Sequence, residues 1–373
     1  MKTTFWLSIP CGISLWILTV SAARADLLVM LPGGGGTYKP HGVLRLDDRT
    51  GAFINQFSTY TENFGGMALG PDEKIYVTGN FMGGGTVYRF SRTGAFLGTF
   101  AFAGPGNLTF GPDGNLYAIG TAAILENPQR YQIPQYNGST GTFMDYFVAP
   151  GSGGTRFMVD LAFGRDGHLY VADYYQGIMR YNGSTGEFMD TFVPAGSAGV
   201  SGYFGFIFGP DGNLYVRSHD SNAVVRFDGN SGTFLDFFVA PGSGGLNSPG
   251  GLAFGPDGNL YVSSSATDQI LRYDGHTGTF LDVFATDAAM INPANLVFTP
   301  PLPRLQINSA GEQTEIIWPS SSFARNWTLT KQHSLEATNQ WTVMTNAPVL
   351  VGTNYVVTDP RDGIAIFYRL EQQ

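Results

Sequence analysis

The sequence has a single cysteine among 373 residues, Cys11, and this residue lies in an apolar stretch near the N-terminus. The rest of the chain therefore has no disulfide, no cysteine-based metal site and no catalytic thiol. Charged residues are also scarce, at 13%, and acidic residues outnumber basic ones by 29 to 20. The net charge of −9 argues against nonspecific binding of nucleic acid, which requires a basic face.

Long hydrophobic runs are missing except for one, from Phe5 to Val20. This run is shorter than the roughly 20 residues that span a bilayer. Lys2 precedes it, and Ala23-Arg24-Ala25 follows as a small-x-small cleavage pattern. We interpret residues 1–25 as a secretory signal peptide. We therefore expect a secreted, periplasmic or cell-envelope protein, bacterial by composition, with no membrane span after cleavage.

Glycine and aromatic residues are abundant, with 51 glycines and 14% aromatics, and they recur in a repeated phrase. Its copies are MALGPDEKIYV from Met67, LTFGPDGNLYA from Leu108, LAFGRDGHLYV from Leu161, FIFGPDGNLYV from Phe206 and LAFGPDGNLYV from Leu252. A second phrase follows each copy, most clearly as VVRFDGNSGTFLDFF from Val224 and ILRYDGHTGTFLDVF from Ile270.

Each repeat predicts four short strands, A to D. Strand A is the Leu-Ala-Phe segment and strand B is Leu-Tyr-Val, and the Gly-Pro-Asp-Gly between them suits a tight turn. Strand C is Leu-Arg-Tyr, and strand D is Phe-Leu-Asp-Val-Phe after an Asp-Gly-x-Thr-Gly loop. Four antiparallel strands in each period of 41–53 residues are typical of a β-propeller blade.

The number of blades follows from the repeat count. Five complete units begin near residues 65, 106, 159, 205 and 250. The N-terminus supplies strands B, C and D of another unit, and its strand A returns at residues 294–298. We therefore predict an all-β, six-bladed propeller over residues 26–299, closed by residues 294–298. Closure of this kind removes free sheet edges.

The composition changes after a stiff linker at residues 300–303. Residues 304–373 contain six short alternating runs, which predict a small β-sandwich: RLQI from Arg304, TEIIW from Thr314, WTLT from Trp327, WTVM from Trp341, YVVT from Tyr355 and IAIFYRL from Ile364. This segment resembles the fibronectin type III-like modules of exported bacterial proteins. It could attach the protein to a surface or a carbohydrate, or act as a spacer whose tryptophans fill its core.

The repeats resemble NHL-type repeats, in the group of six-bladed propellers that includes gluconolactonase/regucalcin-like and virginiamycin B lyase-like proteins. The resemblance implies a site at the central channel and, for the enzymes, a divalent metal. The positions that match the metal ligands of the gluconolactonases hold residues without a side-chain oxygen: Gly65, Gly106, Val159, Phe204, Gly250 and Ala294. One position further on, Asn107, Asp160 and Asn295 are candidate Ca²⁺ ligands. The alternative is that these three side chains only hydrogen-bond strand-end backbone.

In a propeller, the A–B and C–D turns lie on one face, the turn face, and the B–C and D–A loops lie on the other, the loop face. The loop face varies here while the turns repeat, so we expect binding there. Tyr38, Phe81, Tyr174, Tyr175 and His219 are the candidate binding residues. His219 stands beside Asp220, and this pair is the candidate acid–base group.

An arginine recurs at one position of strand C, with Gln135 in its place in one repeat: Arg45, Arg89, Arg180, Arg226 and Arg272. These side chains form either a ring of cations or one repeated blade contact with a strand-end Asp.

The sequence thus favours an exported, noncatalytic propeller that binds a protein or a glycan through its variable loop face. The alternative is a metal-dependent lactonase- or lyase-like enzyme with its site at the central channel. A third interpretation is a purely structural envelope component. No cofactor is expected, with Ca²⁺ as the one ion that the candidate ligands could hold.

Overall fold

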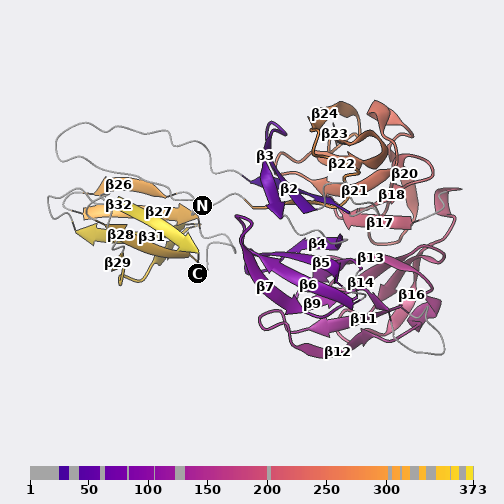
Figure 1. The fold of residues 1–373 in the computed structure, drawn as a ribbon, viewed down its shortest axis with the longest axis horizontal. Coiled ribbons are helices and arrows are strands. Elements are labelled where there is room, and N and C mark those ends of the chain that lie inside the picture. The colour runs from indigo at the N-terminus through magenta and orange to yellow at the C-terminus, as the bar shows by residue number, and fades with distance from the viewer. Residues whose placement is uncertain are drawn as a thin grey trace. The chain divides into compact units, whose positions relative to one another are not determined.

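The computed structural model describes residues 25–32, 42–58, 64–81, 84–104, 106–121, 131–199, 203–300, 305–310, 313–319, 327–332, 342–352, 354–360 and 367–372. The chain is nearly all β, as predicted, and forms a six-bladed propeller followed by a small β-sandwich (Figure 1). Residues 25–299 make one compact unit, and residues 300–373 belong to a second.

Each blade is an antiparallel sheet with strands in the order A, B, C, D from the channel outward. Blade 2 contains β4 (Phe64–Leu69), β5 (Ile75–Phe81), β6 (Gly84–Phe90) and β7 (Phe96–Ala101). Blade 3 contains β8 (Leu108–Phe110), β9 (Leu116–Ala118) with its continuation β10 (Gly120–Thr121), β11 (Tyr131–Tyr136) and β12 (Phe143–Val148).

The remaining complete blades have the same order. Blade 4 contains β13 (Met158–Phe163), β14 (Leu169–Asp173), β15 (Gly177–Tyr181) and β16 (Phe188–Pro194). Blade 5 contains β17 (Tyr203–Phe208), β18 (Leu214–Ser218), β19 (Ala223–Phe227) and β20 (Phe234–Val239). Blade 6 contains β21 (Pro249–Phe254), β22 (Leu260–Ser264), β23 (Gln269–Tyr273) and β24 (Phe280–Thr286).

Blade 1 joins the two ends of the propeller. Its sheet has the order β25 (Leu296–Phe298), β1 (Asp26–Leu31), β2 (Gly42–Asp47) and β3 (Phe53–Ser58). Leu27 pairs with Phe298, and the Thr299 amide donates to the Asp26 carbonyl at 2.9 Å. The last strand of the repeat region therefore hydrogen-bonds to the first, so β1 is not an edge strand and the four-stranded sheet of blade 1 is complete.

A tyrosine in strand B holds five of the six neighbouring pairs of blades together. Its ring makes edge-to-face contacts with a Phe of its own strand D and with the strand-A Phe of the next blade, whose ring centroid lies 4.8–5.1 Å away. The five residues are Tyr76, Tyr117, Tyr170, Tyr215 and Tyr261. Each hydroxyl donates to the Asp of the preceding turn at 2.9–3.0 Å.

The second unit is a sandwich of two sheets. One has the order β26 (Gln306–Ala310), β27 (Gln313–Pro319), β31 (Asn354–Pro360), β30 (Val349–Val351), and the other β29 (Thr342–Val343), β28 (Trp327–Gln332), β32 (Phe367–Gln372). Trp318 is buried in its core beside Tyr368. The sequence predicted six of these strands and missed β30, because Val349–Val351 is apolar throughout and does not show an alternating pattern.

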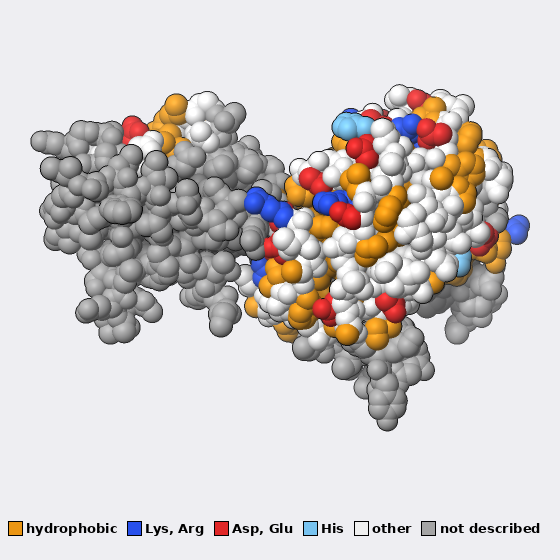
Figure 2. Space-filling view, turned by 90° about the horizontal axis from the view of Figure 1, so that it is seen from above, with side chains coloured by type: hydrophobic (Ala, Val, Ile, Leu, Met, Phe, Trp, Pro, Cys, Tyr) orange, Lys and Arg blue, Asp and Glu red, His pale blue; other side chains and the backbone are white. Residues whose placement is uncertain are grey.

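Figure 2 shows how few charged side chains the surface carries, with hydrophobic side chains spread between them. The helices of the described residues are single 3₁₀ turns: η1 (Ser152–Gly154), η2 (Ser197–Gly199), η3 (Ser243–Gly245) and η4 (Ser265–Thr267). Within this part of the chain, no helix has the length and apolarity to cross a membrane.

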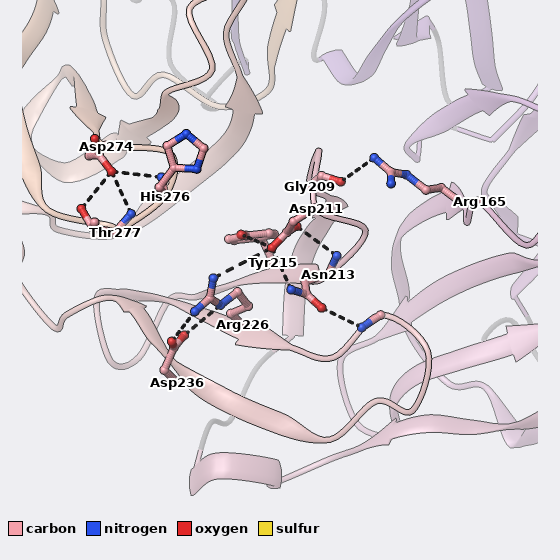
Figure 3. A network of polar contacts seen from close by, with 11 residues as sticks. Arg165, Gly209, Asp211, Asn213, Tyr215, Arg226, Asp236, Asp274, His276 and Thr277 are labelled. Carbon is pink, nitrogen blue, oxygen red and sulfur yellow. Dashed lines mark hydrogen bonds and ion pairs between the residues drawn. The ribbon is translucent and has the colours of Figure 1, made fainter.

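The recurring arginines make a blade contact on the turn face. In blade 5, Arg226 donates to Asp236, directly opposite it on β20, at 3.2 and 2.5 Å (Figure 3). Its guanidinium lies over the Phe238 ring, 5.0 Å from the centroid. Arg180 and Arg272 repeat both contacts, so in these blades the arginines connect strands C and D instead of forming a ring of cations.

Blade 3 keeps every partner of this arginine but lacks the arginine. Gln135 pairs with Asp145 across strands C and D, and Phe147 holds the position of Phe238. The side-chain amide of Gln135 donates to the Tyr117 hydroxyl at 2.6 Å and to Asp113 at 3.0 Å. A hollow of about 580 Å³ adjoins this position, and Asp113, Gln135 and Phe147 contribute to its lining.

We therefore predict that Gln135→Arg stabilises the propeller by about 1 kcal/mol, since it restores a half-exposed ion pair and a cation–π contact. Chemical denaturation of the full chain measures this difference. Gln135→Met, which is similar in length to glutamine but has no charge, is the matched control. An arginine variant no more stable than the methionine variant would contradict the prediction.

Candidate binding site at the mouth of the channel

The inner strands of the six blades, β25, β4, β8, β13, β17 and β21, contact one another in a closed ring around the channel. The ring position that carries the predicted metal ligands holds a polar residue in three blades, Asn295, Asn107 and Asp160, and glycine in the other three, Gly66, Gly205 and Gly251. A Cβ on Gly66 would lie 2.4 Å from Asn107 Oδ1, and one on Gly205 would lie 2.6 Å from Arg217 Nε. The glycines therefore leave room for polar side chains, from a neighbouring blade at Gly66 and from the same blade at Gly205.

These polar side chains form a hydrogen-bonded chain across the channel. Asn295 Nδ2 donates to Asn107 Oδ1 at 2.9 Å, although 188 residues separate them. Asn107 Nδ2 donates in turn to Asp160 Oδ1 at 2.9 Å and to the Val159 carbonyl at 3.0 Å. The three candidate ligands thus lie together, as the repeat alignment indicated.

Their orientation favours the structural alternative over a Ca²⁺ site. The Asn107 amide nitrogen points at the Asp160 carboxylate, and a cation between them would meet an N–H group instead of an oxygen. Turning this amide over would break its bonds to Asp160 and to the Val159 carbonyl. The described residues contain no cluster of three His, Cys, Asp or Glu side chains suited to a metal ion.

Asp160 is the charged end of this chain. Its carboxylate accepts from the backbone amides of Leu161 and Phe206 at 2.9 and 3.0 Å. Burial raises the pKa of Asp160 to about 6, against the opposing effect of these bonds and of the Arg217 charge. Burial likewise lowers the pKa of Arg217 to about 10, although the Asp160 charge opposes that shift.

A cavity of about 450 Å³ opens at this end of the channel. Polar groups on its wall come from Asn107, Asn295, Asn292, Arg217 and His219. Glycines at the strand starts, such as Gly65, Gly106 and Gly250, and apolar residues such as Met30 and Ile119 line much of the rest. The cavity therefore offers amide, guanidinium and imidazole groups beside apolar side chains.

A row of aromatic rings leads out of the cavity along the loop face. Tyr131 and Phe157 line the cavity, and their centroids are 5.4 Å apart. Phe157 contacts Tyr174 at 6.2 Å, and Tyr174 contacts Tyr175 at 4.9 Å. Phe157 is 44% exposed and Tyr175 is 59% exposed. These rings offer apolar faces to a ligand that extends from the cavity.

The predicted acid–base pair lies at the rim of the same cavity. His219 Nδ1 is 3.5 Å from Asp220 Oδ1, and His219 Nε2 is 2.8 Å from Ser248 Oγ. Ser248 has a left-handed φ of +56°, which is uncommon for serine and is often found at functional sites. The order of the three groups is hydroxyl, imidazole, carboxylate.

Most predicted site residues that the structure describes gather at this mouth: Asn107, Asp160, Asn295, Tyr174, Tyr175 and His219. Tyr38 and the Phe81 side chain lie outside the described residues. Sequence analysis missed Tyr131, Phe157, Ser248 and Arg217. Only Arg217 had a usable signal, because it departs from the small or apolar residues that other repeats place there.

Comparisons with known proteins support the fold. No protein-family profile and no curated protein matches the chain. A chain of the nidogen/laminin complex aligns with a TM-score of 0.55 at 14% identity, over 74% of this chain and 98% of that one. A protein of unknown function from Bacteroides caccae aligns with a TM-score of 0.54 at 14% identity, over 74% and 99%. A periplasmic gluconolactonase from Pseudomonas aeruginosa gives 0.47 at 16% identity, over 74% and 99%.

The raised pKa of Asp160 predicts a pH dependence of stability. The folded state binds this proton more tightly than the unfolded state, whose carboxyl has a pKa near 3.8. The contribution of Asp160 to the free energy of unfolding therefore falls as pH rises from about 4 to 6, by at most about 3 kcal/mol. Asp160→Asn removes this titration.

Denaturant unfolding of both proteins between pH 4 and 7 measures the effect. The free-energy difference between wild type and Asp160→Asn should change across this window in favour of the variant. A difference independent of pH would show that Asp160 titrates alike in both states.

Proposed function

We propose that this chain is an exported, noncatalytic propeller that binds a glycan at the mouth of its channel, on the loop face. Export rests on the signal-like sequence of residues 1–25. The aromatic row from Tyr131 to Tyr175 is the observation that carries the choice of ligand. Sugar rings have apolar faces that stack on aromatic side chains, and their hydroxyls pair with amides such as those of Asn107 and Asn295.

A metal-dependent lactonase or lyase has less support. The side chains that would hold its metal are already bonded to one another, with an amide nitrogen facing the carboxylate. Ca²⁺ is therefore not part of the proposed site. A protein ligand would use the same exposed rings, and it is the expected finding if no glycan binds.

Thermal unfolding of residues 26–373 tests the proposal against a panel of neutral and acidic oligosaccharides, and against Ca²⁺ after chelation. A ligand that binds only the folded state raises the unfolding midpoint. We expect a rise with at least one oligosaccharide and none with millimolar Ca²⁺. A rise with Ca²⁺ alone would favour the metal-dependent enzyme.

We predict that Phe157→Ala weakens the affinity for that oligosaccharide roughly 3- to 10-fold, since one stacking contact is lost. Titration calorimetry measures the dissociation constant. Phe143→Ala is a matched control, because Phe143 lies on the outer strand β12 and is 48% exposed, similar to Phe157. Equal affinities for the two variants would place the ligand elsewhere.

A second candidate function is metal-free hydrolysis of an ester at the cavity rim, favoured by the 2.8 Å contact between Ser248 and His219. The Ser248 hydroxyl would attack the acyl carbonyl while His219 takes its proton and passes it to the leaving alcohol. Asp220 would orient the imidazole, and water would then release the acid.

A fluorophosphonate probe tests this chemistry directly. If the triad is active, we expect labelling of wild type at Ser248 and at least about 100-fold slower labelling of His219→Ala, which lacks the general base. Ser265→Ala is the control, because Ser265 lines the same cavity and its hydroxyl donates to the Pro293 carbonyl. Absence of labelling in the wild type would eliminate this candidate.

A further inference from the structure

The cavity at the channel mouth has an unusual charge for this protein. Across the whole chain, acidic residues outnumber basic ones by 29 to 20. Among the described residues, however, the cavity wall includes one guanidinium, Arg217, and one imidazole, His219, but no Asp or Glu side chain. The wall therefore favours a ligand with negative charge.

Other blades make a bond to the next blade at the position of Arg217 without an arginine. The Arg217 guanidinium donates to the Pro249 carbonyl of the next blade at 2.8 Å. At the same position of blades 2 and 6, the hydroxyls of Thr78 and Ser263 donate to carbonyls of the next blade, those of Gly106 and Ala294, at 2.8 and 2.9 Å. A short neutral side chain therefore supplies the contact, and the burial that lowers the pKa of Arg217 is a cost that the fold does not require.

The charge that faces Arg217 from within the protein is Asp160. Both side chains pack over Gly205, where a Cβ would lie 2.6 Å from Arg217 Nε and 3.0 Å from Asp160 Oδ2. Asp160 is not part of the cavity wall, and its oxygens accept from two backbone amides and Asn107. Asp160 thus helps to hold Arg217 in position from the side away from the cavity. At the rim, Asp220 faces His219.

We infer that the cavity recognises a carboxylate-bearing sugar, such as a uronic acid residue of an acidic glycan, with Arg217 binding the carboxylate. This inference rests on the proposed function. Arginine binds carboxylates through charge-assisted, often bidentate hydrogen bonds. The rings of Tyr131 and Phe157 and the amide of Asn292 lie on the same wall, where they suit the apolar face and the hydroxyls of the same sugar.

A matched pair of ligands tests the inference. Calorimetry of residues 26–373 compares trisaccharides of galacturonate, glucuronate and mannuronate with their methyl esters, in which a methyl group on the carboxylate removes the charge and the sugar is unchanged. We expect at least one acid to bind about tenfold or more tightly than its ester, with the preference weakening as salt is added.

Variants of Arg217 test whether its guanidinium causes the preference for the acid over the ester. Arg217→Ser retains the kind of hydroxyl that Ser263 uses between blades, and it should reduce the preference for the acid to about twofold or less. Arg217→Lys keeps the charge and should keep part of the preference. Arg165→Ser is the control, since Arg165 donates to backbone carbonyls on the turn face (Figure 3), and it should leave the preference unchanged.

The outcomes separate this inference from the proposed function. Equal binding of acid and ester by the wild type would overturn the acidic ligand but leave glycan binding intact. A preference that survives in Arg217→Ser would overturn the role of Arg217. Failure of every acid, every ester and every neutral oligosaccharide to bind would overturn both.

Discussion

The contact between a strand-B tyrosine and the strand-A phenylalanine of the next blade is the interaction on which this propeller depends. It recurs five times with ring centroids 4.8–5.1 Å apart, and the last copy, Tyr261 with Phe298, connects blade 6 to blade 1. In blade 1 the tyrosine is replaced by Leu28, and its neighbour in blade 2 is Leu69 in place of Phe, so the pair changes together. Each blade is thereby set at a defined angle to the next, and six such steps close the ring.

The turn face of the propeller carries repeated structural contacts, and the loop face carries the residues that differ between blades. On the turn face, repeated Asp, Arg and Tyr side chains satisfy one another, and in blade 3 Gln135 bonds to the Asp and the Tyr in place of the arginine. On the loop face, the residues that depart from the repeat, Arg217 and His219, gather around the cavity. A repeated scaffold tolerates such departures because its stability comes from the contacts that every blade shares.

Much of the fold was predictable because each blade is a local unit. Turn residues, strand alternation and the period all lie within about 50 residues of one another, so the sequence displays them directly. The return of strand A at residues 294–298 was visible because the N-terminal unit lacks a strand A and an additional strand A follows the last complete unit. The strand β30 was not visible, because its three residues are all apolar and do not alternate, and only its pairing with β31 identifies it as a strand.

The sequence by itself determined the blade, the number of blades and the face on which variation occurs, since these depend on local patterns and on counting. It also indicated that Asn107, Asp160 and Asn295 are neighbours, but not the orientation of the two asparagine side-chain amides. Only the tertiary structure decided that Asn295 donates to Asn107 across 188 residues, that Ser248 meets His219, and that Arg217 lies beside Asp160. These contacts join different blades, and their distances are set by how the closed ring rotates one blade against the next.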